Sequence, residues 1–137
     1  MIPIRTPSAG LLLIAFVAGG CQSYEQYGAE RRGELLTIYP PGVTTRTSVA
    51  ERWGPDRPRE FPRYYAATRP APGWEAFDIP TVGRQALASE KRVGRAVASL
   101  ERYHGPDGRR FLGLCYVWYY YDGDDRLIDV EWQGASD

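Results

Sequence analysis

The C-terminal end of the sequence constrains the fold most strongly, because two β-prone segments there flank a turn. Residues 110–121 are an almost unbroken run of aromatic and aliphatic side chains, and residues 126–133 form a second β-prone segment. The four residues between them, 122–125, have the sequence Asp-Gly-Asp-Asp. An Asp-Gly pair tolerates the positive φ angles that tight hairpin turns require, so the sequence predicts a C-terminal β-hairpin.

The loop length of this hairpin decides which of its faces is buried, because side chains alternate along a strand. With two or four loop residues, one face is apolar and forms core; it carries Cys115, Val117, Tyr119, Ile128, Val130 and Trp132. The opposite face carries Leu114, Tyr116, Trp118, Tyr120, Leu127, Asp129 and Glu131. An exposed aromatic face rimmed by carboxylates is typical of a binding site. The candidate interaction surface is therefore Tyr116, Trp118, Tyr120, Asp129 and Glu131.

Two alternatives remove this surface. A loop of three residues slips the register by one, which swaps the faces and makes the large aromatic side chains core. A helix that packs on the aromatic face buries it without any change of register. The sequence leaves all three arrangements open.

Two helices are expected before the hairpin. The first is short: Thr44 or Thr45 can cap it, and Gly54 followed by proline ends it. The second is long and covers residues 84–103, where apolar side chains recur at helical spacing before Gly105 and a proline end it. Its apolar stripe consists of Ala86, Val93, Ala96, Val97, Leu100 and Tyr103.

Further strands are expected at residues 35–39, 63–68 and 74–79, which are β-prone and bounded by Pro and Gly. Together with the hairpin they predict an α+β domain: an antiparallel sheet of four to five strands with both helices on one face. Residues 51–56 also resemble residues 101–107, since both contain Gly-Pro-Asp and precede a tyrosine-bearing strand. Either the chain consists of two helix–strand–strand units, or two helix ends share these residues independently.

The N-terminal segment has the features of an export signal. Arg5 is the only charge before Glu25, and the small and apolar residues 9–20 would span about 18 Å as a helix, less than a bilayer requires. The motif Ala18-Gly19-Gly20-Cys21 resembles the bacterial lipobox. That resemblance implies cleavage before Cys21 and acylation of this residue, which would anchor the chain to a membrane. The alternative is an ordinary secreted protein with an incidental cysteine.

This interpretation divides the chain into three parts. Residues 1–20 are the lipoprotein signal peptide, residues 21–33 the lipidated N-terminus and a flexible tether, and residues 34–135 a single α+β domain. Gln22 stands where an inner-membrane retention signal usually has Asp. In a bacterium with two membranes, this favours the periplasmic face of the outer membrane.

Charge gives no indication of a nucleic-acid partner, because the chain carries 17 Lys+Arg and 17 Asp+Glu. The charges are unevenly distributed, however: residues 84–110 are mainly basic and residues 122–137 mainly acidic. Either the two segments neutralise each other or are simply solvated, or the basic one faces anionic head groups.

Catalytic, cofactor and metal sites are not expected. His104 is the only histidine, and a Cys115–His104 pair would need a strand thiol to reach a loop imidazole. The acidic turn at residues 122–125 lacks the EF-hand spacing, since Leu127 stands where that loop needs glycine. No glycine-rich nucleotide-binding loop is present. We therefore predict that the chain is not an enzyme.

Residues 42–55, with Gly42, Thr45, Val49 and Trp53-Gly54-Pro55, resemble the first-helix signature of the SmpA/OmlA (BamE-like) small outer-membrane lipoproteins. The resemblance implies a non-enzymatic scaffold in outer-membrane assembly or envelope integrity, with an envelope protein as partner, and it assigns no catalytic residue. The alternative function is a ligand-binding module that recognises cell-wall glycan or peptide through the aromatic sheet face.

Overall fold

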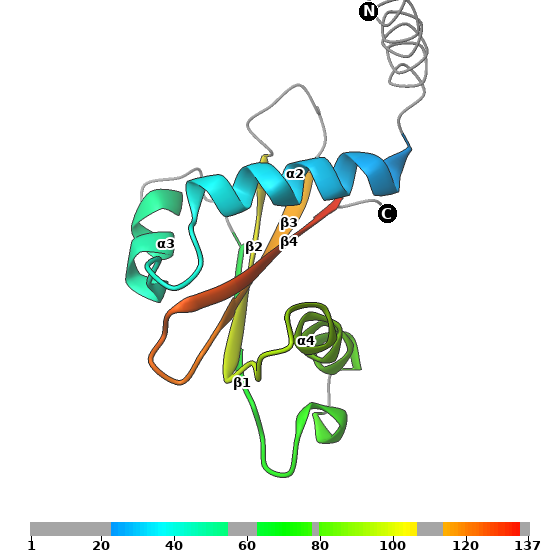
Figure 1. Cartoon of the computed structure of the whole chain (residues 1–137), viewed down its shortest axis with the longest axis vertical. Helices are drawn as coiled ribbons and strands as arrows, with labels where there is room; N and C mark the ends of the chain where they lie inside the picture. Colours follow the sequence, from blue (N-terminus) through cyan, green and yellow to red (C-terminus); the bar gives the residue numbers. More distant parts are fainter. Residues whose placement is uncertain (1–22, 55–62, 78–79, 107–113, 135–137) are drawn as a thin grey trace, which may run out of the picture.

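A four-stranded antiparallel sheet with helices on both faces organises the chain (Figure 1). The computed structural model describes residues 23–54, 63–77, 80–106 and 114–134; the predicted signal peptide, Cys21 and most of the predicted loop at 54–62 lie outside these ranges. The elements are α2 (Tyr24–Ile38), α3 (Arg46–Trp53), β1 (Arg63–Thr68), the 3-10 turn η2 (Trp74–Ala76), α4 (Pro80–Val93), β2 (Ser99–Pro106), β3 (Leu114–Tyr121) and β4 (Leu127–Gly134).

The sheet has the order β1-β2-β3-β4, and every neighbouring pair is antiparallel. The predicted α+β class and the strand number are therefore confirmed. The predicted strand at 63–68 coincides with β1, and the C-terminal hairpin is β3 and β4. Edge strands β1 and β4 begin and end the meander, and β3 lies in the centre with its side chains covered on both faces.

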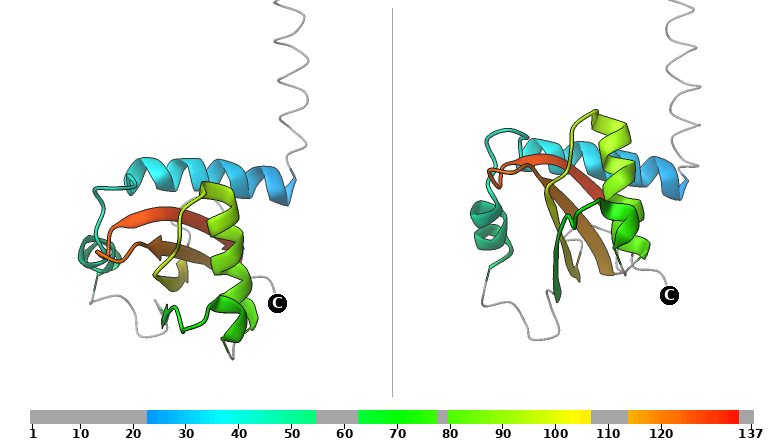
Figure 2. Two further views of the ribbon diagram at one scale, coloured as in Figure 1. Left: turned by 60° about the horizontal axis from the view of Figure 1, so that its bottom comes forward. Right: turned by 90° about the horizontal axis from the view of Figure 1, so that it is seen from below.

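Helices cover both faces of the sheet rather than one, as the two views in Figure 2 show. On the face of α2 and α3, the buried cluster contains Leu35, Tyr39, Val49, Trp53, Tyr103, Cys115, Val117, Tyr119, Tyr121, Leu127, Val130 and Trp132. On the face of α4 and η2, it contains Ala67, Trp74, Val82, Ala86, Val97, Leu100, Trp118, Tyr120 and Ile128. Strand β3 places large side chains on both faces, so each face needs its own helical cover.

Helix α2 overturns two predictions for the start of the chain. Residues 22–33 are predicted as part of a tether and residues 35–39 as a strand, whereas α2 runs through most of both. The side chain of Ser23 accepts a hydrogen bond from the Gln26 N–H at 3.1 Å, and the Ser23 N–H donates to the Gln26 side chain at 2.8 Å. This capping box satisfies two backbone groups and fixes the first turn of the helix.

The buried side of α2 explains why the sequence pattern does not reveal the helix. Tyr27, Arg31 and Leu35 recur every four residues along this side, and Arg31 and Leu35 are each only 5% exposed. Arg31 therefore interrupts an otherwise apolar stripe. Its guanidinium donates to the Glu34 carboxylate at 2.6 Å, which keeps the charge paired where the helix meets the sheet.

Helix α3 confirms the predicted short helix. Thr45 is its N-cap and accepts from the Ser48 N–H at 3.2 Å, while the Thr45 N–H donates to the Ser48 hydroxyl at 3.1 Å. Val49 and Trp53 are buried, and Gly54 ends the helix with φ +81°, a conformation that glycine adopts without strain.

The predicted long helix at 84–103 is wrong beyond residue 93. Helix α4 ends where the Gly94 N–H donates to the Glu90 carbonyl at 2.8 Å with φ +69° at Gly94, and residues 99–106 then form β2. Along β2, Leu100 contributes to one buried cluster and Tyr103 to the other, which is the alternation of a strand covered on both faces. The two-unit repeat is therefore also wrong, because residues 101–106 end no helix.

The predicted strand at 74–79 is wrong for the residues that the structure describes. Residues 74–76 form η2, and residues 78–79 lie outside the described ranges. Trp74 is fully buried, and its indole N–H donates to the Val97 carbonyl at 3.3 Å. Trp74 therefore packs in the buried cluster between α4 and the sheet and is not part of a strand.

The hairpin register places most side chains on the faces expected for a loop of two or four residues. Tyr119 pairs with Val130 and Tyr120 with Asp129, but Tyr121 pairs with Leu127, so the strand contains a bulge at Ile128. The bulge exchanges the faces of the first two residues of β4: Leu127 joins the face of Tyr121, and Ile128 joins the face of Tyr120. The predicted faces of Leu127 and Ile128 are therefore wrong, while those of the following residues are right.

Candidate interaction surface

The predicted aromatic surface is mostly buried. Trp118 is 1% exposed, Tyr120 and Asp129 are fully buried, and Tyr116 and Glu131 are half-buried. Helix α4 and η2 supply the cover, which is the helix-cover alternative that the sequence left open. The polar atoms are also used internally: the Trp118 indole N–H donates to the Gln133 side chain at 2.9 Å, and the Tyr120 hydroxyl donates to Glu131 at 2.8 Å.

Asp129 ties the helices on the two faces together around the edge strand β4. Its carboxylate accepts from Arg32 of α2 at 2.7 Å, and from Ser89 and Arg92 of α4 at 2.8 and 2.5 Å. The Arg32 guanidinium also donates to the Val130 carbonyl at 3.1 Å. Burial alone lowers the pKa of Arg92, but the hydrogen bond and charge of Asp129 outweigh it, so this pKa is raised. Asp129 is therefore a structural residue rather than part of a surface.

The uneven charges along the sequence meet in space. Arg92 lies 3.8 Å from Glu131 in addition to its contact with Asp129, and Arg95 lies 3.6 Å from Asp122. The basic segment 84–110 thus neutralises part of the acidic segment 122–137, as one of the alternatives predicts.

Cys115 and His104 lie on opposite faces of the sheet. Cys115 belongs to the buried cluster under α2 and α3, whereas the His104 ring stacks on Tyr116 at 4.4 Å between centroids. Gly105 pairs with Cys115 and His104 with Tyr116, so the alternation of the strands directs the two side chains apart. Cys115 and His104 therefore do not form the pair that the sequence allowed. Within the described ranges, no group of three or more His, Cys, Asp or Glu side chains could hold a metal ion.

A different apolar surface lies at the connection between α2 and α3. Val43 is 72% exposed and Ile38 is 42% exposed, and both are among the four exposed large apolar side chains of the described residues. Pro40 and Pro41 between them are exposed as well. We call these four residues, Ile38, Pro40, Pro41 and Val43, the corner surface.

The backbone of this connection is fixed to the sheet. The Gly42 N–H donates to the Leu127 carbonyl, and the Leu127 N–H donates to the Thr44 carbonyl, each at 2.8 Å. The Thr44 hydroxyl and N–H both donate to the Pro40 carbonyl, at 2.8 and 3.1 Å. Gly42 has φ +86°, which favours glycine at this position. The corner surface is therefore presented on a closed, hydrogen-bonded loop.

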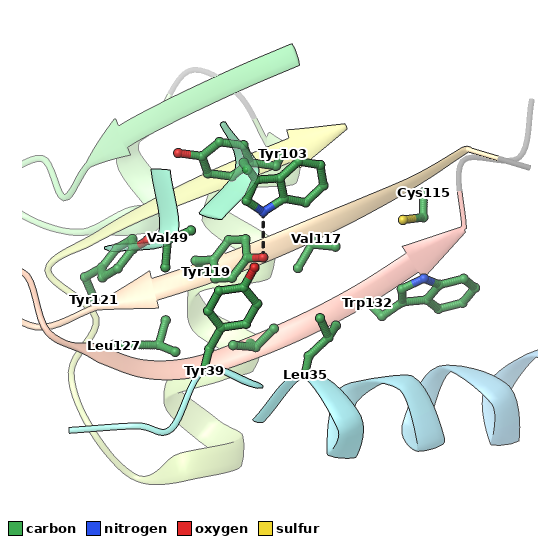
Figure 3. Packing of buried hydrophobic residues seen from close by; sticks show 12 residues of the cluster. Leu35, Tyr39, Val49, Tyr103, Cys115, Val117, Tyr119, Tyr121, Leu127 and Trp132 are labelled. Atoms are coloured by element: carbon green, nitrogen blue, oxygen red, sulfur yellow. Dashed lines mark hydrogen bonds between the residues drawn. The ribbon is translucent and has the colours of Figure 1, made fainter. Parts of the chain in front are cut away.

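Buried aromatic side chains join the two helices that flank the corner surface; Figure 3 shows Tyr39 and Tyr119 among them. The Tyr119 hydroxyl accepts from the Trp53 indole N–H at 2.8 Å, and the Tyr119 ring packs edge-on against Tyr39 at 5.1 Å. Burial raises the pKa of Tyr119 well above its ordinary value. Because Tyr39 follows α2 and Trp53 ends α3, this one side chain holds the helices on both sides of the corner.

An ion pair between the half-buried Arg46 and the buried Glu101 fixes the other side of the corner. Arg46, the first residue of α3, donates to Glu101 at 2.8 Å and lies over the Tyr121 ring at 4.4 Å. The Tyr121 hydroxyl donates to the second oxygen of Glu101 at 2.9 Å. Burial raises the pKa of Tyr121, and the neighbouring Glu101 carboxylate raises it further. The connection that carries the corner surface is therefore supported by packing at both of its ends.

Sequence analysis did not identify the corner surface, because it assigns residues 35–39 to a strand and Pro40-Pro41-Gly42 to its end. Helical spacing gives no signal for it either, because Ile38 lies three residues after Leu35 and seven after Arg31, on the same side of α2 as these buried residues; it is exposed as the last residue of the helix. The predicted lipid site Cys21 lies outside the described ranges, and none of the described helices combines the length and apolar character that a membrane span requires.

No protein-family model matches the chain, and no curated protein and no solved structure is significantly similar to it.

Proposed function

We propose that this chain is a membrane-anchored envelope lipoprotein that acts without catalysis, by binding a protein partner through the corner surface. The observation that carries the proposal is Val43, which is 72% exposed on a backbone fixed by hydrogen bonds to β4. An apolar side chain in this setting contributes nothing to the core, yet it is held in one position. Rigid apolar contacts bind well because little conformational entropy is lost on association.

The anchor in this proposal is the lipid on Cys21, which the lipobox resemblance implies. In a bacterium with two membranes, the protein would lie on the periplasmic face of the outer membrane and take part in assembly or integrity of that membrane. The partner would then be another envelope protein. The cell-wall glycan or peptide alternative needs an exposed aromatic face; since Trp118 and Tyr120 are buried, no observation favours it.

Photo-crosslinking in intact cells tests the corner surface. A benzophenone amino acid replaces Val43, and the matched control carries it at Leu87 on α4, an exposed apolar position away from the corner. We expect position 43 to capture one discrete envelope protein, and we expect Val43→Asp, but not Leu87→Asp, to abolish co-purification of that protein. Equal capture at both positions, or unchanged co-purification with Val43→Asp, would contradict the proposal.

The anchor has a separate test. Cys21→Ser should yield a protein that retains residues 1–20 and carries no acyl chain, as measured by mass spectrometry. A normally cleaved, lipid-free product would show instead that an ordinary signal peptidase processes the chain.

A further inference from the structure

We infer that the start of α2 rests on the lipid head groups, so that the folded domain is seated on the membrane surface without a tether. The inference rests on the proposed lipid anchor at Cys21 and goes beyond it, because an anchor alone leaves the position and orientation of the domain open. Three observations carry it: the short link between anchor and fold, the contacts that hold the start of α2, and the chemistry of the exposed first turn.

The link is short because the fold begins immediately after the anchor. Only Gln22 separates Cys21 from Ser23, and Ser23 already belongs to the capping box of α2. Two residues of extended chain reach about 7 Å. The polar layer of one leaflet is of similar depth, about 5–7 Å. An acylated Cys21 therefore leaves the first turn of α2 no room to move out of the head-group region.

The start of α2 cannot swing away from the sheet either. The Tyr24 hydroxyl accepts from the Gly134 N–H at 2.7 Å, and the Tyr24 ring lies 5.5 Å from that of Trp132. Tyr27 packs edge-on against the same indole at 5.0 Å, and Trp132 is only 5% exposed. Gly28 faces Trp132 so closely that a Cβ there would lie 3.4 Å from the ring. The anchor thus positions the whole domain rather than a loose helix.

The residues of the first turn of α2 are of the kind that contact lipid head groups. They are too polar to enter the acyl-chain region, and they include no basic residue that would select anionic lipids. Tyr24 is 55% exposed, and tyrosine is enriched at the membrane–water interface because its ring is apolar and its hydroxyl polar. Ser23, Glu25 and Gln26 around it are exposed and polar, and none of them is basic. We therefore expect contact that does not depend on anionic lipid.

In the proposed arrangement α2 stands away from the membrane, so that the corner surface lies at the far end of the helix from the anchor. Helix α2 has 15 residues and so extends about 22 Å, with Tyr24 at its start and Ile38 at its end. Figure 1 shows the same arrangement, with α3 and the α2–α3 connection at the opposite end of α2 from its start. The partner would meet the corner surface beyond the head groups.

Fluorescence quenching in vesicles tests this inference on the lipidated full-length protein. An environment-sensitive nitrobenzoxadiazole label is attached at Glu25→Cys or, as the matched control, at Val43→Cys; both positions are exposed, whereas Cys115 is buried. The vesicles contain phosphatidylethanolamine and phosphatidylglycerol with a head-group spin label as quencher. We expect several-fold stronger quenching at position 25 than at position 43, with little change when phosphatidylglycerol is replaced by a zwitterionic lipid.

A second variant keeps the anchor and lengthens the link, with about ten Gly and Ser residues inserted between Gln22 and Ser23. Quenching at position 25 should fall to the level at position 43; if it persists, the short link is not what seats the domain. Equal quenching at the two positions without the insertion would overturn the inference while leaving the anchor intact. If mass spectrometry finds no acyl chain on Cys21, both the proposed anchor and the proposed contact of α2 with the head groups are wrong.

Discussion

The two ends of helix α2 are held in different ways. At the start, side chains make the attachment, because Tyr24 and Tyr27 pack around the buried ring of Trp132. Beyond the end, backbone groups make it, through the hydrogen bonds of Gly42 and Thr44 with Leu127. Tyr39 also packs on Tyr119 at this end, but the hydrogen bonds fix the connection itself without its own apolar side chains. Ile38 and Val43 can then remain exposed and serve recognition.

The largest effect is expected at the start of α2. Trp132→Ala removes an indole that is 5% exposed and leaves a cavity between α2 and β4, so we expect the free energy of unfolding to fall by about 3–5 kcal/mol. Urea denaturation measures this loss. Trp132→Phe keeps an aromatic ring against Tyr24 and Tyr27 and should lose clearly less. Equal losses in the two variants would show that the aromatic contacts do not hold this end.

The next effect is expected below the corner. Arg46→Met removes the guanidinium from the Glu101 carboxylate, which is 2% exposed, and leaves a buried charge that still accepts a hydrogen bond from the Tyr121 hydroxyl. Burial alone lowers the pKa of Arg46, but the hydrogen bond and charge of Glu101 outweigh it and raise it. Because Arg46 is itself 24% exposed, we expect a loss of about 2–3 kcal/mol in urea denaturation.

Arg46→Met combined with Glu101→Gln separates the lost pair from lost packing. The double variant has no buried charge at this position, so it should regain part of the stability that Arg46→Met loses. A double variant less stable than either single variant would show that the two side chains contribute mainly through contacts with other groups.

A much smaller stability effect is expected at the corner surface. Val43→Asp changes a side chain that is 72% exposed, so the free energy of unfolding should change by less than about 0.5 kcal/mol, while capture of the partner is lost. Leu87→Asp on α4 should have the same small cost and leave capture unchanged. A large loss of stability in Val43→Asp would show that Val43 supports the fold, which would break the contrast between the two ends of α2.

Local signals predicted the parts of the fold that depend on a few neighbouring residues. The hairpin turn and the capping of α3 by Thr45 are both of this kind, although the positive φ of the turn falls at Asp125, at +59°, and not in the Asp122-Gly123 pair. Prediction failed where a local pattern misled: Arg31 hides the buried stripe of α2, and the residues between Val97 and Tyr103 fit helical spacing although they alternate along β2. Residues 99–106 form a strand because they pair with β1 and β3, and this pairing cannot be read from the local sequence.

The candidate site was harder to predict, because exposure is a property of the whole fold. The alternation of Tyr116, Trp118 and Tyr120 was predicted correctly, but their burial depends on α4, which is far away in the sequence. Ile38 and Val43 pose the opposite difficulty. Apolar side chains are expected inside, and only the hydrogen bonds that fix the connection leave these two outside.

The smallest effect is expected at the β3–β4 turn, where backbone N–H groups donate hydrogen bonds to the side chain of Asp122. The Asp122 carboxylate accepts from the N–H groups of Arg126 and Asp124 at 3.0 and 2.8 Å, and mainly the first of these lowers its pKa. A lowered pKa adds stability above the ordinary pKa of about 3.9, and this stability is lost as the pH falls through the folded-state pKa.

Asp122→Asn keeps an oxygen that can accept both hydrogen bonds but does not titrate. Its stability, measured by urea denaturation between pH 7 and pH 2.5, should therefore fall less steeply below pH 4 than that of the unmodified protein. The difference should be small, since the carboxylate is 23% exposed and solvent screens its charge. Parallel pH profiles would mean that the turn is held by its backbone bond from the Asp122 N–H to the Arg126 carbonyl, at 2.9 Å, without help from the charge.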